Sequence, residues 1–188
     1  MSQSTAAAEI AEQLPAGRWT IDPVHSSVEL SVRHMMVSKV KGRFTRFSGT
    51  IVVGEDPFDS SVTASIEAAS VDTHDPNRDN HLRSPDFFDV ERFPTLDFRS
   101  TEVRPGSGGH VLAGDLTIHG VTRPVELRLE HNGTGPDPYG GIRTGFSAET
   151  EINRKDFGLT WNAAIETGGA VVGDKIRVTL EIEAVREA

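Results

Sequence analysis

Cysteine is absent from this 188-residue chain. Its absence excludes a disulfide framework, a zinc site with Cys ligands and a thiol nucleophile. The seven histidines are scattered, and neither an HExxH motif nor a dense cluster of carboxylates accompanies them. The sequence therefore predicts no metal site, no catalytic residues and no cofactor.

Positive charge is also scarce. The chain has 19 Lys and Arg against 28 Asp and Glu, a net charge of −9, and no basic run is longer than two residues. Because binding to phosphate backbones requires clustered cations, we do not expect a nucleic acid as partner.

Long apolar runs are missing as well, so we expect no integral membrane segment. Residues 1–16 contain neither a positively charged start nor an apolar stretch of seven residues, which predicts a cytoplasmic protein without a signal peptide. They offer few groups to bury, and we expect a flexible lead-in, with a short helix at 6–14 as its only regular element.

From residue 17 onward, apolar and polar residues alternate. Val28, Leu30, Val32 and His34 share one side of an expected strand, and similar runs recur along the chain, separated by turns rich in Gly, Pro and Asp. This pattern is typical of antiparallel strands with one buried face. About eight such strands must either close on themselves or pack on a second sheet. We predict an all-β, antiparallel up-and-down barrel of about eight strands, with a sandwich as the second choice.

Residues 77–90 interrupt the alternation. The stretch "NRDNHLRSPDFF" lacks β-branched residues, and we expect a short helical segment with Asn77 as a cap and Pro85 as its end. Two interpretations of its polar residues stay open. Arg78 and His81 could hold a ligand headgroup at the mouth of the barrel, or the polar side chains could bind strand backbone and plug the barrel end.

Several motifs in order carry a resemblance to a known family. They include "IDPVHSSVELSVRH" at 21–34, "RDNHLRSPDFFD" at 78–89, "LAGDLTIHGVTRPVEL" at 112–127 and "INRKDFGL" at 152–159. The chain resembles the YceI-like family of lipid-binding proteins from about residue 17 to residue 185. The resemblance implies one lipocalin-like barrel domain over residues 17–188, which encloses a long isoprenoid or a similar amphiphile.

Small residues on the expected inward faces favour a hollow barrel. Ala64, Ala68, Thr144, Ala148 and Thr150 alternate with polar neighbours at inward positions, and an eight-stranded barrel is wide enough to hold one ligand. We therefore expect a non-enzymatic carrier of a polyisoprenoid, an isoprenoid quinone or a fatty-acyl lipid. A homodimer stays open.

From the strand pattern and the resemblance together, one set of residues is expected to contact the ligand. These residues are Val28, Leu30, Val32, His34, Ile66, Arg78, His81, Phe87, Phe88, Phe98, Leu116, Ile118, Leu127, Phe146, Ala148, Ile152 and Trp161.

Two other functions stay open at this point. One is an enzyme that acts on a small lipid in the same cavity, with His34 or His81 as general base. The other is a stress-response barrel with a packed interior and a partner on its surface. His110, His119 and His131 are expected to lie in turns.

Overall fold

The computed structural model describes residues 13–164 and 171–188. Strands dominate these residues: β1 (Gly17–Ile21), β2 (Ser27–His34), β3 (Ser38–Phe44), β4 (Phe47–Val53), β5 (Ser61–Glu67), β6 (Val71–Asp72), β7 (Thr95–Gly106), β8 (Gly109–Ile118), β9 (Val121–Pro136), β10 (Ile142–Asn153) and β11 (Val172–Arg186). One α-helix, α2 (Pro76–Arg83), and three 3-10 turns, η1 (Pro57–Asp59), η2 (Ala68–Ser70) and η3 (Arg154–Phe157), complete the described elements.

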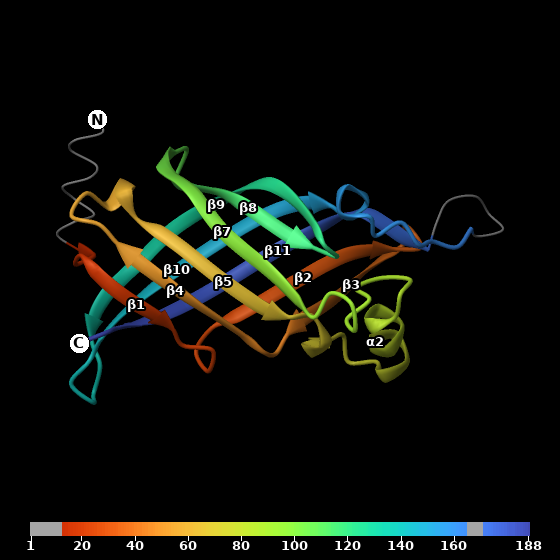
Figure 1. Cartoon of the computed structure of the whole chain (residues 1–188), viewed down its shortest axis with the longest axis horizontal. Coiled ribbons are helices and arrows are strands. Elements are labelled where there is room, and N and C mark those ends of the chain that lie inside the picture. Colours follow the sequence, from red (N-terminus) through yellow and green to blue (C-terminus); the bar gives the residue numbers. More distant parts are fainter. Residues whose placement is uncertain (1–12, 165–170) are drawn as a thin grey trace.

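Eight of the strands form a closed antiparallel ring in the order β1-β4-β5-β7-β8-β9-β10-β11. Strand β1 closes it, because it pairs with β4 on one side and with the end of β11 on the other. The beginning of β11 pairs instead with β2, which continues into β3 and β6. Figure 1 shows the strands crossing the barrel diagonally, with α2 at one end and the C-terminus at the other. The predicted all-β, lipocalin-like barrel is confirmed.

The α2 end of the barrel is filled by side chains. Buried residues from six parts of the chain form one apolar cluster there, namely Val28, Phe44, Ala68, Val71, Leu96, Ile118, Phe157 and Leu159. Phe88 packs edge-on against Phe44, with ring centroids 5.7 Å apart. This end of the interior therefore resembles an ordinary packed core.

Helix α2 begins two residues earlier than the sequence predicts. Asp75, not Asn77, is its N-cap: the Asp75 carboxylate accepts hydrogen bonds from the backbone N–H groups of Asn77 and Arg78. Pro76 occupies the first turn, where its missing N–H costs nothing. The helix ends at Arg83, just before Ser84 and Pro85, and residues 84–92 form turns.

The polar residues of α2 bind residues 69–73, which comprise the end of η2, strand β6 and Thr73 after it. Arg78 donates from Nε to Thr73 Oγ1 (2.7 Å) and from Nη2 to the Thr73 carbonyl (2.8 Å). The buried Asp79 accepts from the N–H and the hydroxyl of Thr73, and Arg83 donates to the carbonyls of Ala69 and Val71. Of the two interpretations of this segment, these contacts support the one in which it closes the barrel end.

The N-terminal segment differs from expectation at Leu14. This side chain is only 6% exposed and packs with the buried Trp19, whose Nε1 donates to the Pro15 carbonyl. Residues 14–16 therefore contact the barrel, because Leu14 does offer an apolar group to bury. The predicted helix at 6–14 falls mostly on residues 1–12, which lie outside the described part. No helix in the described part is long and apolar enough to cross a membrane.

Arg154 is a buried cation that holds the segment after β10. Its side chain, 3% exposed, donates to the backbone carbonyls of Leu159, Trp161 and Gly173 at 2.7–2.9 Å. Burial lowers the pKa of Arg154, and nearby Asp174 partly opposes that shift. The Arg154 guanidinium thus provides hydrogen bonds both to carbonyls just after η3 and to the Gly173 carbonyl in β11.

Replacing this guanidinium is expected to destabilise the fold. In Arg154→Met the buried carbonyls lose their donors, so the free energy of unfolding should fall by about 3 kcal/mol. The matched control is Lys155→Met, since the half-exposed Lys155 pairs with the same Asp174 and an exposed pair contributes about 0–1 kcal/mol. Urea unfolding of both variants measures the difference, and equal midpoints would contradict the role given to Arg154.

Candidate functional site

An apolar cavity of about 200 Å³ occupies the middle of the barrel and the end opposite α2. Every strand of the closed ring except the short β1 contributes at least one side chain from its middle, and β1 contributes Ile21 at its end. Leu14, Pro57 and Phe58 line it from the segments beside the strands. No Lys, Arg, Asp or Glu is among the described residues that line it, so its interior favours an apolar occupant.

The structure places part of the predicted ligand-contacting set at this cavity. The predicted residues that line it are Val28, Ile66, Phe98, Leu116, Leu127, Phe146 and Ala148. Ala148 packs with Leu112 and Leu127 at the cavity wall. Their contact with a ligand stays a prediction.

The other predicted residues lie elsewhere. Leu30, Phe88, Ile118 and Ile152 belong to the filled α2 end. Val32 and His34 are at the end of β2, paired with Ile176 and Val172. Strand alternation identified the inward face correctly for the first group, but it contains no information on depth along the barrel. Inward residues near α2 therefore became core rather than cavity wall.

Arg78 and the aromatic residues near α2 also lie away from the cavity. Arg78 is bound to Thr73. His81 forms a compact group with Phe87 and Trp161, with ring centroids 5.1 and 4.6 Å from its own, and its Nε2 is 2.8 Å from Asp86. Neither His81 nor His34 lines the cavity, so neither is placed to act as a base on a lipid bound there.

Several cavity residues were missing from the predicted set. They are mainly large aliphatic residues on the same inward faces, namely Ile21, Ile51, Val53, Val62, Leu112, Leu129 and Ile182, together with Leu14 before β1. Their period-two alternation was the available signal. These residues differ from the predicted ones in lying at the end of the barrel opposite α2. That position depends on how distant strands pair, which alternation does not show.

The expectation for two histidines was wrong. His110 lies in β8 and His131 in β9, and both line the cavity; only His119 is in a turn, with φ of 54°. His110 pairs with Leu129, so His131, two residues further on, is its diagonal neighbour on the same face. The His131 ring also packs on Phe146, with centroids 5.2 Å apart. Burial lowers the pKa of both histidines, and His110 lowers that of His131 further.

Comparison with known proteins agrees with this architecture. The family model described as YceI-like domain matches residues 19–184. The chain belongs to the YceI-like family. A UPF0312 protein of Serratia proteamaculans is 38% identical over 163 residues, which cover 86% of this chain and 82% of the relative. A UPF0312 protein of Vibrio cholerae is 41% identical over 139 residues, 72% of each chain.

Solved structures of the YceI-like fold superpose well. The Campylobacter jejuni YCEI protein has a TM-score of 0.71 at 30% identity, covering 83% of this chain and 90% of its own. BcnA of Burkholderia cenocepacia has a TM-score of 0.75 at 21% identity, covering 87% of this chain and 98% of BcnA. A polyisoprenoid binding domain of Saccharophagus degradans has a TM-score of 0.65 at 17% identity, covering 90% and 98%. At 21% and 17% identity, the comparisons with BcnA and with the polyisoprenoid binding domain show similarity of fold alone.

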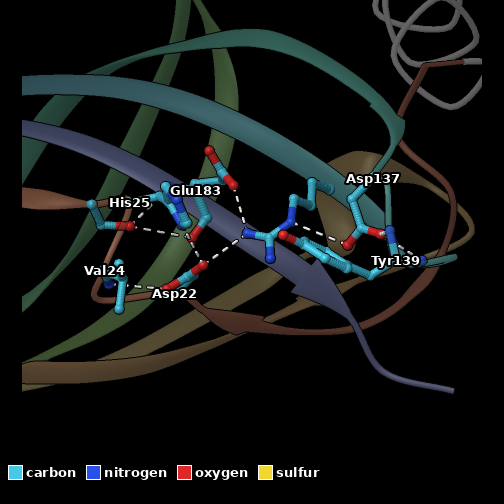
Figure 2. Close-up of polar contacts among 9 residues, drawn as sticks. Asp22, Val24, His25, Asp137, Tyr139 and Glu183 are labelled. Atoms are coloured by element: carbon cyan, nitrogen blue, oxygen red, sulfur yellow. Dashed lines mark hydrogen bonds and ion pairs between the residues drawn. The ribbon is translucent and has the colours of Figure 1, made fainter.

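A network of charged residues ties together the strand ends opposite α2. Arg143 of β10 donates from Nη1 to Asp22 (2.7 Å) and Glu183 (2.6 Å), and from Nε to Asp137 (3.2 Å). Figure 2 shows Asp22, Glu183 and Asp137 converging from separate segments. Arg143 holds the pKa of the Asp22 carboxyl well below its usual range, with help from His25. Asp22 and Glu183 in turn raise the pKa of Arg143.

Three members of this network are also spaced like metal ligands. Within residues 13–164 and 171–188, ligand atoms of Asp22, His25 and Glu183 lie within 4.8 Å of one another. The Arg143 guanidinium already bridges the two carboxylates, however. The geometry is therefore that of an ion-pair network that fastens β1, β10 and β11 together.

This network predicts a specific dependence of stability on pH. The depressed pKa of Asp22 stabilises the fold above the carboxyl's unfolded pKa of about 3.9, and that stabilisation is lost as pH falls through the lower folded value. The substitution Arg143→Met should therefore lower the Tm at pH 7. The difference in Tm between wild type and variant should become smaller below about pH 4.

The control is Arg128→Met, which removes the more exposed Arg128–Glu149 pair between β9 and β10. Thermal melts at pH 7, 5 and 3 measure all three proteins. The role of the network would be contradicted if the difference in Tm between wild type and Arg143→Met were the same at all three pH values. It would also be contradicted if Arg128→Met showed the same difference.

Proposed function

We propose that this YceI-like protein is a non-enzymatic carrier that encloses the hydrocarbon chain of a polyisoprenoid, isoprenoid quinone or fatty-acyl lipid. The observation that carries the proposal is the cavity: it lies inside a closed barrel, and aliphatic and aromatic side chains make up nearly all of its wall. Membership of the YceI-like family supports the proposal. The description of the Saccharophagus degradans neighbour as a polyisoprenoid binding domain also supports it.

The size of the cavity favours a slender ligand. Its volume of about 200 Å³ lies below the roughly 300–1,000 Å³ of pockets for drug-sized molecules. A single chain entering along the barrel fits such a space better than a bulky ring system. Each buried methylene contributes about 0.8 kcal/mol, so six to ten of them yield about 5–8 kcal/mol to offset the cost of association.

Extraction of the purified protein tests the proposal directly. Denaturing organic extraction followed by mass spectrometry should release a chain lipid in near-stoichiometric amount, and protein made in different hosts should release chains of similar length. If extracts from several hosts contain no such lipid, and delipidated protein binds no apolar probe, the carrier function is wrong.

A substitution in the cavity wall distinguishes a hollow barrel from a packed one. Ala148 is 7% exposed and lines the cavity, so in Ala148→Trp the indole should occupy the space of the ligand chain. We expect loss of binding of a fluorescent fatty-acyl probe, with the free energy of unfolding of the delipidated protein changed by less than about 1 kcal/mol. In a packed core the same insertion would cost about 1–3 kcal/mol or more.

Glu151→Trp is the matched control, because Glu151 is on the outer face of the same strand and pairs with Lys175. It should leave probe binding intact. An Ala148→Trp protein that binds the probe normally would show that Ala148 does not face the ligand.

A further inference from the structure

One polar cluster interrupts the apolar cavity, at the end opposite α2. His131 Nε2 is 3.1 Å from Thr134 Oγ1 and 3.0 Å from Thr144 Oγ1. Thr134 donates to Thr144 Oγ1 (2.9 Å), and Thr144 donates to the Gly133 carbonyl (3.2 Å). Thr144 is only 2% exposed. These groups form a fixed, satisfied network behind the His131 ring at the cavity wall.

A bulge in β9 creates this cluster. His131 pairs with Phe146 and Gly133 pairs with Gly145, which leaves Asn132 as an extra residue in β9. His131 and Thr134 are three residues apart, so in a regular strand they would face opposite sides. The extra residue turns both inward, and Gly133 adopts φ of 127°, a conformation that L side chains rarely take. Bulges commonly re-aim side chains in this way.

His110 adds a second imidazole beside the first. It lines the same cavity, is the diagonal neighbour of His131 across β8 and β9, and packs near Phe58 of η1 with centroids 6.0 Å apart. Two imidazoles therefore line the cavity, with two hydroxyls behind one of them, where the wall is otherwise built from residues such as Leu129 and Phe146. Packing alone does not require polar side chains here, because apolar residues of similar size would avoid their desolvation cost.

We propose that His131, positioned by Thr134 and Thr144 and accompanied by His110, is a subsite for the uncharged, oxygen-bearing end of the bound lipid, such as a hydroxyl or amide group. This inference rests on the proposed carrier function and narrows its ligand class. The hydroxyl protons of Thr134 and Thr144 are directed to Thr144 Oγ1 and to the Gly133 carbonyl, so Nε2 of the neutral His131 is the donor toward these hydroxyls. Its Nδ1 is left as an acceptor, which matches the O–H of an alcohol or the N–H of an amide.

The same geometry disfavours lipids with an anionic end. No Lys or Arg lines the cavity among the described residues, and a buried phosphate or carboxylate without a partner cation is costly. Burial lowers the pKa of His110 and His131, so near neutral pH neither imidazole supplies a positive charge. The chain's net charge of −9 also repels anions at longer range.

Three probes with the same fifteen-carbon chain test this subsite: farnesene, farnesol and farnesyl diphosphate, which end in a hydrocarbon, an alcohol and a diphosphate. Affinities are measured by calorimetry with delipidated protein at pH 8. We expect farnesol to bind at least about 10-fold more tightly than farnesyl diphosphate. The substitution His131→Leu should lower the affinity for farnesol about 5- to 10-fold, which is the effect of losing one hydrogen bond. It should leave the affinity for farnesene unchanged.

Two further variants make the test specific. The substitution Thr144→Val keeps the shape of the side chain but removes the hydroxyl that binds Nε2 of His131. It should lower the affinity for farnesol about threefold without changing the affinity for farnesene. His34→Leu is the matched control, because His34 is a strand histidine outside the cavity, and it should change no affinity. Thermal melts check that each variant is folded.

The outcomes separate the subsite from the carrier function. Diphosphate binding as tight as alcohol binding, or a loss in His131→Leu that is equal for all three probes, would overturn the subsite and leave the carrier function standing. If not even farnesene binds, the carrier function fails and the subsite fails with it.

Discussion

Closure of the eight-stranded ring is the constraint on which the rest of the structure depends. It rests on the short strand β1, which must pair with β4 and β11 at once. Closure removes the exposed sheet edges and fixes which side of every strand faces inward. The Arg143 network reinforces the same seam from outside, since its partners come from the chain after β1, from the β9–β10 connection and from β11. Without this seam there is no enclosed interior for a ligand.

The interior divides into two halves with different tasks. Near α2, aromatic side chains such as Phe44, Phe88 and Phe157 fill the barrel, and Arg78, Asp79 and Arg83 fasten the helix to the neighbouring backbone. At the other end, the inward aliphatic and aromatic side chains leave space. The filled half provides a stable core, so the hollow half can lack packing without loss of the fold. A binding cavity is tolerated here because the core lies beside it.

Much of this could be predicted from the sequence, because alternation is a local property. The strands, the barrel and the inward direction of Phe98, Leu127 and Ala148 all follow from it. Depth along the barrel does not, since it depends on pairing between distant strands, and Ile118 and Ile152 were therefore assigned to the ligand rather than to the core. The Gly and Pro residues near His110 and His131 indicate turns in the sequence, whereas β8 already begins at Gly109 and β9 continues to Pro136. The β9 bulge has no local signature beyond Gly133.

The bulge also means that the polar cluster does not require one fixed spacing of its residues along the chain. Deleting Asn132 alone would leave His131, Thr134 and Thr144 in the sequence. His131 and Thr134 would then be two residues apart and would face the same side of a regular strand, while the pairs of β9 with β10 on either side of the bulge would persist. Relatives of this chain with one residue fewer here would thus keep the same inward cluster on a regular strand, differing only in the backbone bend of the bulge. An alignment that scores only substitutions would not detect that difference.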